Sequence, residues 1–212
     1  MDALNQISTT LALTMGLAWA SGINLYATLF TLGYLANTGN IDLPPDLQVV
    51  ANPMVMGAAG IMYCIEFFAD KVPGVDTGWD ALHTFIRIPA GAMLAAGAVG
   101  DLNPAVELAA AIMGGGLAAG SHATKAGSRV LINTSPEPFS NWIASIGEDI
   151  LVITGVWASI NHPVLFLIAL AGFIVLMIWL LPRIWVGIKK VLIFIGNLFR
   201  NESPPTGENP PH

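Results

Sequence analysis

The chain has 212 residues, of which 54% are hydrophobic and 10% are charged, whereas about a quarter of the residues in a soluble domain are charged. Its 14 acidic and 8 basic residues give a net charge of -6, and the absence of a basic run excludes a nucleic-acid surface. With 22 glycines and a mean hydropathy of +0.67, the composition excludes a disordered chain and indicates a helical membrane protein.

The first apolar stretch, residues 7–36, is too long for one upright straight span. A bilayer core needs about 20 helical residues, and this stretch would measure about 45 Å at the helical rise. Because Ser21, Gly22 and Asn24 interrupt its middle, we expect a tilt, a kink or a locally unwound segment between Ser21 and Asn24.

Five further apolar stretches follow, separated by loops rich in proline, glycine and aspartate. Together with the first they predict an all-α fold, a polytopic membrane bundle of about six transmembrane helices within residues 1–182. The five expected spans are residues 53–69, 80–100, 104–124, 141–160 and 163–181.

The C-terminal part after Pro182 differs from the spans. Residues 183–200 combine an apolar face with basic residues and are too short for a seventh crossing, so they predict an interfacial amphipathic helix. Residues 201–212 contain four prolines and predict a disordered cytoplasmic tail.

The basic residues give the expected orientation. Six crossings that begin on one side place all 8 lysines and arginines on that side. The positive-inside rule identifies that side as the cytoplasm, so both termini are expected there.

Two stretches, residues 52–102 and 103–160, predict a parallel repeat of one helical hairpin. Asn52-Pro53 and Asn103-Pro104 start the units, because asparagine caps a helix and proline suits its first position. Each second helix follows a tryptophan. Coincidence is the alternative.

Charges inside the spans predict an ion pair. Arg87 lies in the third span, and Glu148 and Asp149 lie at a similar depth in the fifth. Because an unpaired charge in a membrane is costly, we expect Arg87 to pair with Glu148 or Asp149. The pair has either a functional role or only a packing role.

The second and third spans hold the densest polar patch. Asp70 and Asp76 are expected in a solvated loop, whereas Glu66 precedes the loop inside an apolar stretch and is expected to be functional. The candidate substrate- or ion-binding residues are Glu66, Asp70, His83, Arg87, Glu148 and Asp149.

Two other ligand classes are considered. Lys125 and Arg129 are spaced to receive an anion or a lipid headgroup, with ordinary positive-inside anchoring as the alternative. Asp76, Asp80 and His83 are candidate ligands of a divalent metal. No motif for another cofactor is evident in the sequence.

Glycines provide small-residue faces on the second and fourth spans. Gly57 with Gly60 and Gly116 with Gly120 allow close helix approach, within the bundle or in a homo-oligomer. The bilayer is the expected partner. Asn24 either marks a helix break of the kind seen in ion-coupled carriers or makes an interhelical hydrogen bond.

Two polar motifs resemble a known family. One runs from Glu66 through Ala69-Asp70-Lys71-Val72-Pro73-Gly74 to Trp79-Asp80, with His83 and Arg87 following, and the other from Lys125 to Pro138. They are similar to a bacterial membrane family known only as domain of unknown function 4126. The resemblance implies a multi-pass protein of the bacterial inner membrane and supplies no activity, substrate or catalytic residue.

Three functions remain open from the sequence. The leading hypothesis is a small-solute or ion transporter or channel with a polar site open to the cytoplasmic side. The first alternative is an intramembrane enzyme that acts on a lipid headgroup, with or without a metal. The second is a non-catalytic membrane scaffold.

Overall fold

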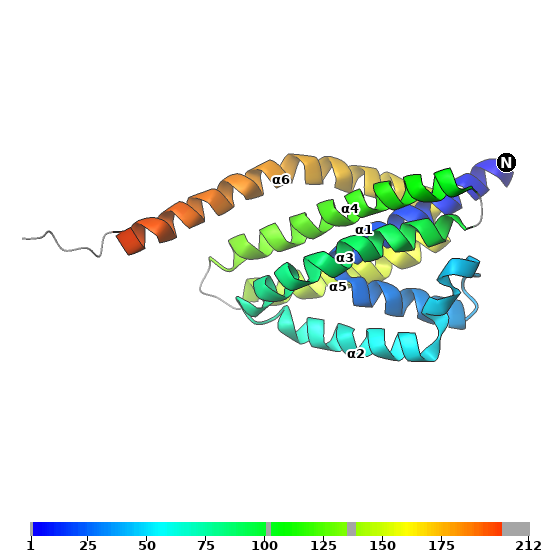
Figure 1. Cartoon of the computed structure of the whole chain (residues 1–212), viewed down its shortest axis with the longest axis horizontal. Coiled ribbons are helices and arrows are strands. Elements are labelled where there is room, and N and C mark those ends of the chain that lie inside the picture. The colour runs from blue at the N-terminus through cyan, green and yellow to red at the C-terminus, as the bar shows by residue number, and fades with distance from the viewer. Residues whose placement is uncertain (1, 101–102, 135–138, 201–212) are drawn as a thin grey trace, which may run out of the picture.

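The computed structural model describes residues 2–100, 103–134 and 139–200, and this part of the chain is helical with no β-strand (Figure 1). The all-α prediction is confirmed, and α2 occupies the residues expected for the second span. The elements are α1 (Asp2–Asn37), the short 3-10 helix η1 (Pro45–Ala51), α2 (Pro53–Ala69), α3 (Val75–Val99), α4 (Pro104–Ile132), α5 (Phe139–Asn161) and α6 (Pro163–Arg200).

Among the described residues, three helices, α3, α5 and α6, are long and apolar enough to cross a membrane. The pair η1 and α2, bent by 63°, adds a fourth crossing if it forms one span. The outward faces of these helices carry large apolar side chains such as Phe85, Ile153 and Ile178, which suits contact with lipid. The structure therefore supports membrane association of a helical bundle.

The first helix does not run the length of the bundle. Asn24 has extended backbone angles (φ -147°, ψ 98°), and the chain reverses there, so that the two halves of α1 run in opposite directions (Figure 1). Ala3 lines a cavity with Pro44 and Val106, and Asn37 Nδ2 donates to the carbonyl of Ala51 (2.8 Å). Both ends of α1 thus lie at one end of the bundle, and α1 is a helical hairpin, which we call the re-entrant hairpin because its chain returns to the end from which it started. The break expected between Ser21 and Asn24 is confirmed.

This path corrects the expected topology. We call the end of the bundle that holds residues 38–52 and the start of α4 the acidic end, and the end that holds residues 70–74 and the end of α6 the basic end. The first described residues lie at the acidic end and α6 finishes at the basic end (Figure 1). The start of α1 and the end of α6 therefore lie at opposite ends of the bundle, because α1 returns to the end from which it started, whereas the sequence predicted both termini on one side. The side of a membrane on which each terminus lies stays a prediction.

The re-entrant hairpin forms the centre of the packing. Leu17, Ala18 and Leu32 of α1 are buried, and Trp19 packs edge-on against Phe166 and Phe173 of α6. This burial satisfies the rule that irregular backbone at membrane depth is enclosed by protein or lines a cavity.

Glycine lets the helices around the tip approach closely. A methyl group at Gly22 would collide with the Ala118 carbonyl and the Ser121 hydroxyl of α4, and one at Gly91 would lie 2.6 Å from Ser21 Oγ. Small residues at such crossings allow backbone contact between membrane helices. By contrast, Gly57 and Gly116 face open space, so the expected Gly116–Gly120 pair does not pack as a unit inside this chain. A homo-oligomer through these faces stays a prediction.

The predicted helix starts are confirmed. The side chain of Asn52 accepts from Met54 N, and that of Asn103 accepts from Ala105 N, both at 2.8 Å. Each cap satisfies a backbone donor that the first helical turn leaves free. The hairpins α2–α3 and α4–α5 therefore begin alike, and the repeat itself stays a prediction.

The last helix is longer than expected. It continues through Pro182 to Arg200, so no helix end separates a spanning part from residues 183–200. Ile184 is buried against Gly127 of α4, and Gly187 packs against Leu131. An interfacial position for residues 183–200 stays a prediction, and the predicted tail, residues 201–212, lies outside the described residues.

Candidate functional site

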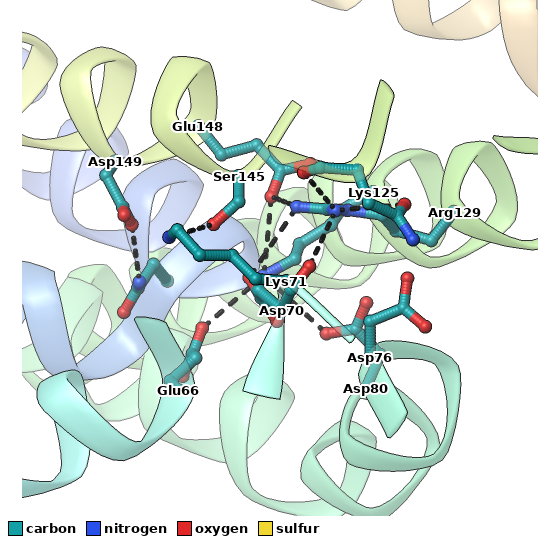
Figure 2. Close-up of polar contacts among 12 residues, drawn as sticks. Glu66, Asp70, Lys71, Asp76, Asp80, Lys125, Arg129, Ser145, Glu148 and Asp149 are labelled. Atoms are coloured by element: carbon teal, nitrogen blue, oxygen red, sulfur yellow. Dashed lines mark hydrogen bonds and ion pairs between the residues drawn. The ribbon is translucent and has the colours of Figure 1, made fainter. Parts of the chain in front are cut away.

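Seven charged side chains from α2, α3, α4 and α5 and the residue that follows α2 meet inside the bundle, and Figure 2 shows six of them. Six of these side chains are 3% exposed or less, and Glu148 is 19% exposed. We call this group the charge cluster: Glu66, Asp70, Asp80, Arg87, Lys125, Arg129 and Glu148.

Arg87 of α3 joins two carboxylates. It donates from Nη2 to Glu66 Oε1 of α2 (2.7 Å) and from Nη1 to Asp80 Oδ1 (2.8 Å). Asp80 lies seven residues earlier on α3, which is two helical turns and thus the same face. The expected pairing of Arg87 with Glu148 or Asp149 is wrong, because the carboxylates of α2 and α3 lie closer to Arg87.

Lys125 of α4 lies in the middle of the cluster. Its Nζ donates to Asp70 Oδ2 at 2.8 Å and to Glu66 Oε1 at 3.4 Å. It lies 3.6 Å from Glu148 Oε2 and 3.7 Å from Asp80 Oδ1. One cation therefore contacts all four carboxylates of the cluster.

Arg129, one turn after Lys125, connects α4 with the ends of two other helices. Its Nη2 donates to Glu148 Oε2 of α5 (2.7 Å), and its Nη1 donates to the carbonyls of Asp70 (3.1 Å) and Asn141 (3.0 Å). The side chains of Lys125 and Arg129 are 2% and 0% exposed. The structure thus places these two residues inside the protein, where carboxylates match their charge, and not at a headgroup-binding surface.

His122 extends the cluster toward the centre of the bundle. Arg87 Nη1 lies 3.2 Å from His122 Nδ1 and can only donate. His122 Nε2 therefore carries the ring proton and donates to Thr84 Oγ1 (2.7 Å), which in turn donates to the carbonyl of Asp80 (3.0 Å). Assigned in this way, His122 is a neutral link between α3 and α4.

A second polar group lies at the basic end. Asn133 Nδ2 donates to both carboxylate oxygens of Asp76 (2.8 and 3.0 Å) and to Thr77 Oγ1 (2.9 Å). Asn141 Nδ2 donates to Asn133 Oδ1 (2.6 Å). Asp70 and Asp76 are 2% and 0% exposed, so the expectation of a solvated loop at these positions is wrong.

The three candidate metal ligands have separate partners. Asp80 binds Arg87, Asp76 binds Asn133, and His83 stacks on Trp79 with ring centroids 4.2 Å apart. His83 Nδ1 donates to the carbonyl of Trp79 (2.9 Å), and its Nε2 lies 3.1 Å from the Tyr26 hydroxyl. Within the described residues, no three His, Cys, Asp or Glu side chains are grouped to hold a metal ion, and the metal hypothesis stays a prediction.

Asp149 faces the tip of α1 (Figure 2). Its Oδ1 accepts from Asn24 Nδ2 (3.0 Å), while Asn24 Oδ1 accepts from Ala27 N (2.9 Å). The same amide therefore caps the second half of α1 and joins the tip to α5. Asn24 thus fulfils both sequence hypotheses, a helix break and an interhelical hydrogen bond.

Lys71, in the loop after α2, lies at the edge of this region. Its Nζ donates to the Phe67 carbonyl (3.0 Å) and to Ser145 Oγ of α5 (3.3 Å), and it lies over the Phe67 ring. Burial lowers the pKa of the Lys71 ammonium, and the nearby carboxylates of Asp149 and Asp70 oppose that shift.

The pairing of the cluster is incomplete. Four carboxylate oxygens are buried without a hydrogen-bond partner among the described residues, namely Glu66 Oε2, Asp70 Oδ1, Asp80 Oδ2 and, beside the cluster, Asp149 Oδ2. In the described part of the chain, five cavities of 340 to 680 Å³ have linings that contain no side chain of the charge cluster. The cluster is therefore enclosed in this conformation and holds unused acceptors.

The sequence pattern identified most of the acids of the charge cluster and Arg87 as site residues, but it did not predict which basic residue binds each acid. The structure brings Glu66, Asp70, Arg87 and Glu148 together as one site, with His83 and Asp149 at its borders. Asn133 and Asn141 had no assigned role. Their positions beside the basic motif that begins at Lys125 are the signal that pointed to them.

Comparison with known proteins identifies the family of the chain. Residues 11–183 match the family described as Domain of unknown function (DUF4126). The chain belongs to this family. No curated protein and no solved structure matches the chain. The two motifs that carried the resemblance pack against each other, since the acids of the first bind Lys125 and Arg129 of the second.

Proposed function

We propose that this DUF4126 protein is a membrane transporter or channel for a small cation, with a path past the tip of α1 and the charge cluster. The re-entrant hairpin is the observation that carries the proposal. Broken helices whose ends meet near the middle of a membrane form the binding sites of many transporters. Here the break at Asn24 contacts Asp149, one residue from a member of the charge cluster.

The sign of the buried charge supports a cation as the transported species. Four carboxylates and three basic side chains form the charge cluster, which leaves one surplus negative charge. Asp76 and Asp149, 0% and 6% exposed, add two more carboxylates to the buried region. A path through this region attracts cations and repels anions.

The opening of the site is the step that transport requires. Glu148 is the most exposed side chain of the cluster, and it lies on the same helix as Ser145, which contacts Lys71. The links from α2 to α4 include the ion pairs of Glu66 and Asp70 with Lys125. Separation of α2 from α4 and α5 would expose the cluster toward the basic end, which by the positive-inside rule faces the cytoplasm of a bacterial inner membrane.

A scaffold is the second candidate, and the extent of ion pairing favours it. A buried network in which every basic residue binds a carboxylate fixes the arrangement of helices without any transported ion. The unused carboxylate oxygens distinguish the two candidates, because a purely structural network has no need for a surplus of buried acids.

The test is cation flux in sealed vesicles. Purified protein in liposomes is given a gradient of H⁺, Na⁺ or K⁺, and the decay of each gradient is followed with an internal dye. We expect the wild-type protein to dissipate at least one gradient, Glu66→Gln to lose this activity, and Glu107→Gln, which alters an exposed acid of α4 at the acidic end, to retain it. Decay equal to that of protein-free vesicles for all three ions would overturn the proposal and support the scaffold.

A further inference from the structure

We infer that Asp149 is a proton-binding site and that its protonation releases the link between α5 and the tip of α1. This inference rests on the proposed function, because it makes the proton the transported or coupling ion. The step is a simple transfer: a proton from the aqueous phase forms an O–H bond with one carboxylate oxygen of Asp149, and the reverse step returns it to water.

Asp149 differs from the four acids of the charge cluster in its lack of a cation. Its side chain is buried; one oxygen accepts from the neutral amide of Asn24, and the other has no partner in full hydrogen-bond geometry among the described residues. The Tyr63 hydroxyl, which is also neutral, is a further neighbour of this carboxylate. Glu148, the preceding residue, has Arg129 at 2.7 Å. Within the described part of the chain, no lysine, arginine or histidine nitrogen lies within the 4.0 Å of an ion pair with Asp149, although such pairs hold every acid of the charge cluster.

The groups around Asp149 come from several elements. On the α2 side Tyr63, Glu66, Asp70 and Lys71 face it, α4 contributes Lys125, and α1 contributes Asn24. The two basic groups have other partners, since Lys125 binds Asp70 and Lys71 binds Ser145 and a backbone carbonyl.

A proton fits this environment better than a metal ion. Divalent cations such as Ca²⁺ and Mg²⁺ need several oxygen ligands, and the amide oxygen of the Asn24 side chain that binds Asp149 already accepts from Ala27 N. A carboxylate in an enclosed site without a counter-ion is costly, and a single proton removes that charge without further ligands.

The hydrogen bond to Asn24 couples this proton to the backbone. An ionised carboxylate accepts a charge-assisted bond, which is about twice as strong as a bond between neutral groups. Protonation of Asp149 therefore weakens the contact from Asn24 Nδ2, while Asn24 Oδ1 continues to cap the second half of α1. The tip of the hairpin is then free to separate from α5.

Infrared spectroscopy tests the inference without a transport assay. Protein in liposomes is recorded over a range of pH, with and without ¹³C-labelled aspartate, and the carboxylic acid C=O band is followed. We expect a band that shifts with the label, titrates with pH and disappears in Asp149→Asn. Asp46→Asn, which alters an exposed acid in η1, serves as the control and is expected to keep the band.

Two results would overturn the inference. One is the absence of any titrating aspartic acid band in the labelled wild-type protein, a measurement that needs no variant. The other is a titrating band that persists unchanged in Asp149→Asn. The outcome is separable from that of the flux experiment, since cation flux without such a band contradicts this site alone, and a band without flux contradicts the transporter alone.

Discussion

The pair between Glu66 and Arg87 gives a quantitative test of the charge cluster. Both side chains are fully buried and their atoms lie 2.7 Å apart. Replacement of Arg87 by methionine leaves Glu66 and Asp80 with Lys125 alone, at 3.4 and 3.7 Å. The surplus of the cluster rises from one negative charge to two. Removal of one partner of a buried pair costs about 3–5 kcal/mol, and we expect Arg87→Met to lower the free energy of unfolding by this amount.

The reverse single change is expected to be milder. In Glu66→Met, Arg87 keeps Asp80 at 2.8 Å and Lys125 keeps Asp70 at 2.8 Å, and the cluster becomes neutral. We expect a loss of about 1.5–3 kcal/mol, the value of a hydrogen bond to a charged group. In the double variant the surplus returns to one negative charge, so its loss should be smaller than the sum of the single losses by about 1–3 kcal/mol.

The assay is reversible denaturation in detergent micelles, followed by tryptophan fluorescence and extrapolated to zero denaturant. Arg183→Met is the matched control, since Arg183 is exposed on α6 and should change stability by no more than about 0.5 kcal/mol. Losses of Arg87→Met and Glu66→Met that add within about 0.5 kcal/mol would refute the reasoning, because independent sites behave in that way.

Two further predictions concern the hairpin. Gly22→Ala should destabilise the protein by about 1–3 kcal/mol in the same denaturation assay, because its methyl group would collide with the Ala118 carbonyl and Ser121. Gly57→Ala is the control, since Gly57 faces open space, and it should not destabilise the protein. Equal effects of the two variants would contradict the close approach of α1 and α4. In a Cys64→Ser background, Asn5→Cys and Lys189→Cys should react with a membrane-impermeant thiol reagent from opposite sides of sealed vesicles, and reaction of both from one side would contradict the re-entrant path.

The sequence predicted the helices well because their signals are local. Asn52 and Asn103 cap helices through bonds to residues two positions later, and such short-range patterns can be identified from the order of residues alone. The interruption at Asn24 was also predictable, since an amide beside a Ser-Gly pair is unusual in an apolar stretch. The direction of the chain after Asn24 was not, because reversal depends on the packing of both halves against α3, α4 and α5.

Basic residues could not reveal this reversal. The first lysine or arginine in the chain is Lys71, so the N-terminal 70 residues contribute nothing to a rule that counts positive charge. Whether α1 crosses completely or returns as a hairpin, its last residue lies at the same end, so each later loop has the same position in both topologies. What separates the two topologies is the position of the start of α1, where Ala3 lines a cavity together with Val106 of α4.

The ion-pair partners of the buried charges could not be predicted from the sequence for a related reason. Lys125 and Arg129 lie in the same half of the bundle whether they anchor the protein at the cytoplasmic surface or pair with buried carboxylates. The distribution of charge along the chain is therefore compatible with both interpretations. What decides between them is the position of α2, whose acids Glu66 and Asp70 lie within reach of these two side chains. Three of the eight basic residues, Arg87, Lys125 and Arg129, are therefore in the basic half because carboxylates bind them there. The orientation of the protein then depends on the other five, which lie in the loop after α2 and in the last part of α6. These five are all at the basic end, so the positive-inside rule still predicts a cytoplasmic basic end when the three buried basic residues are left out.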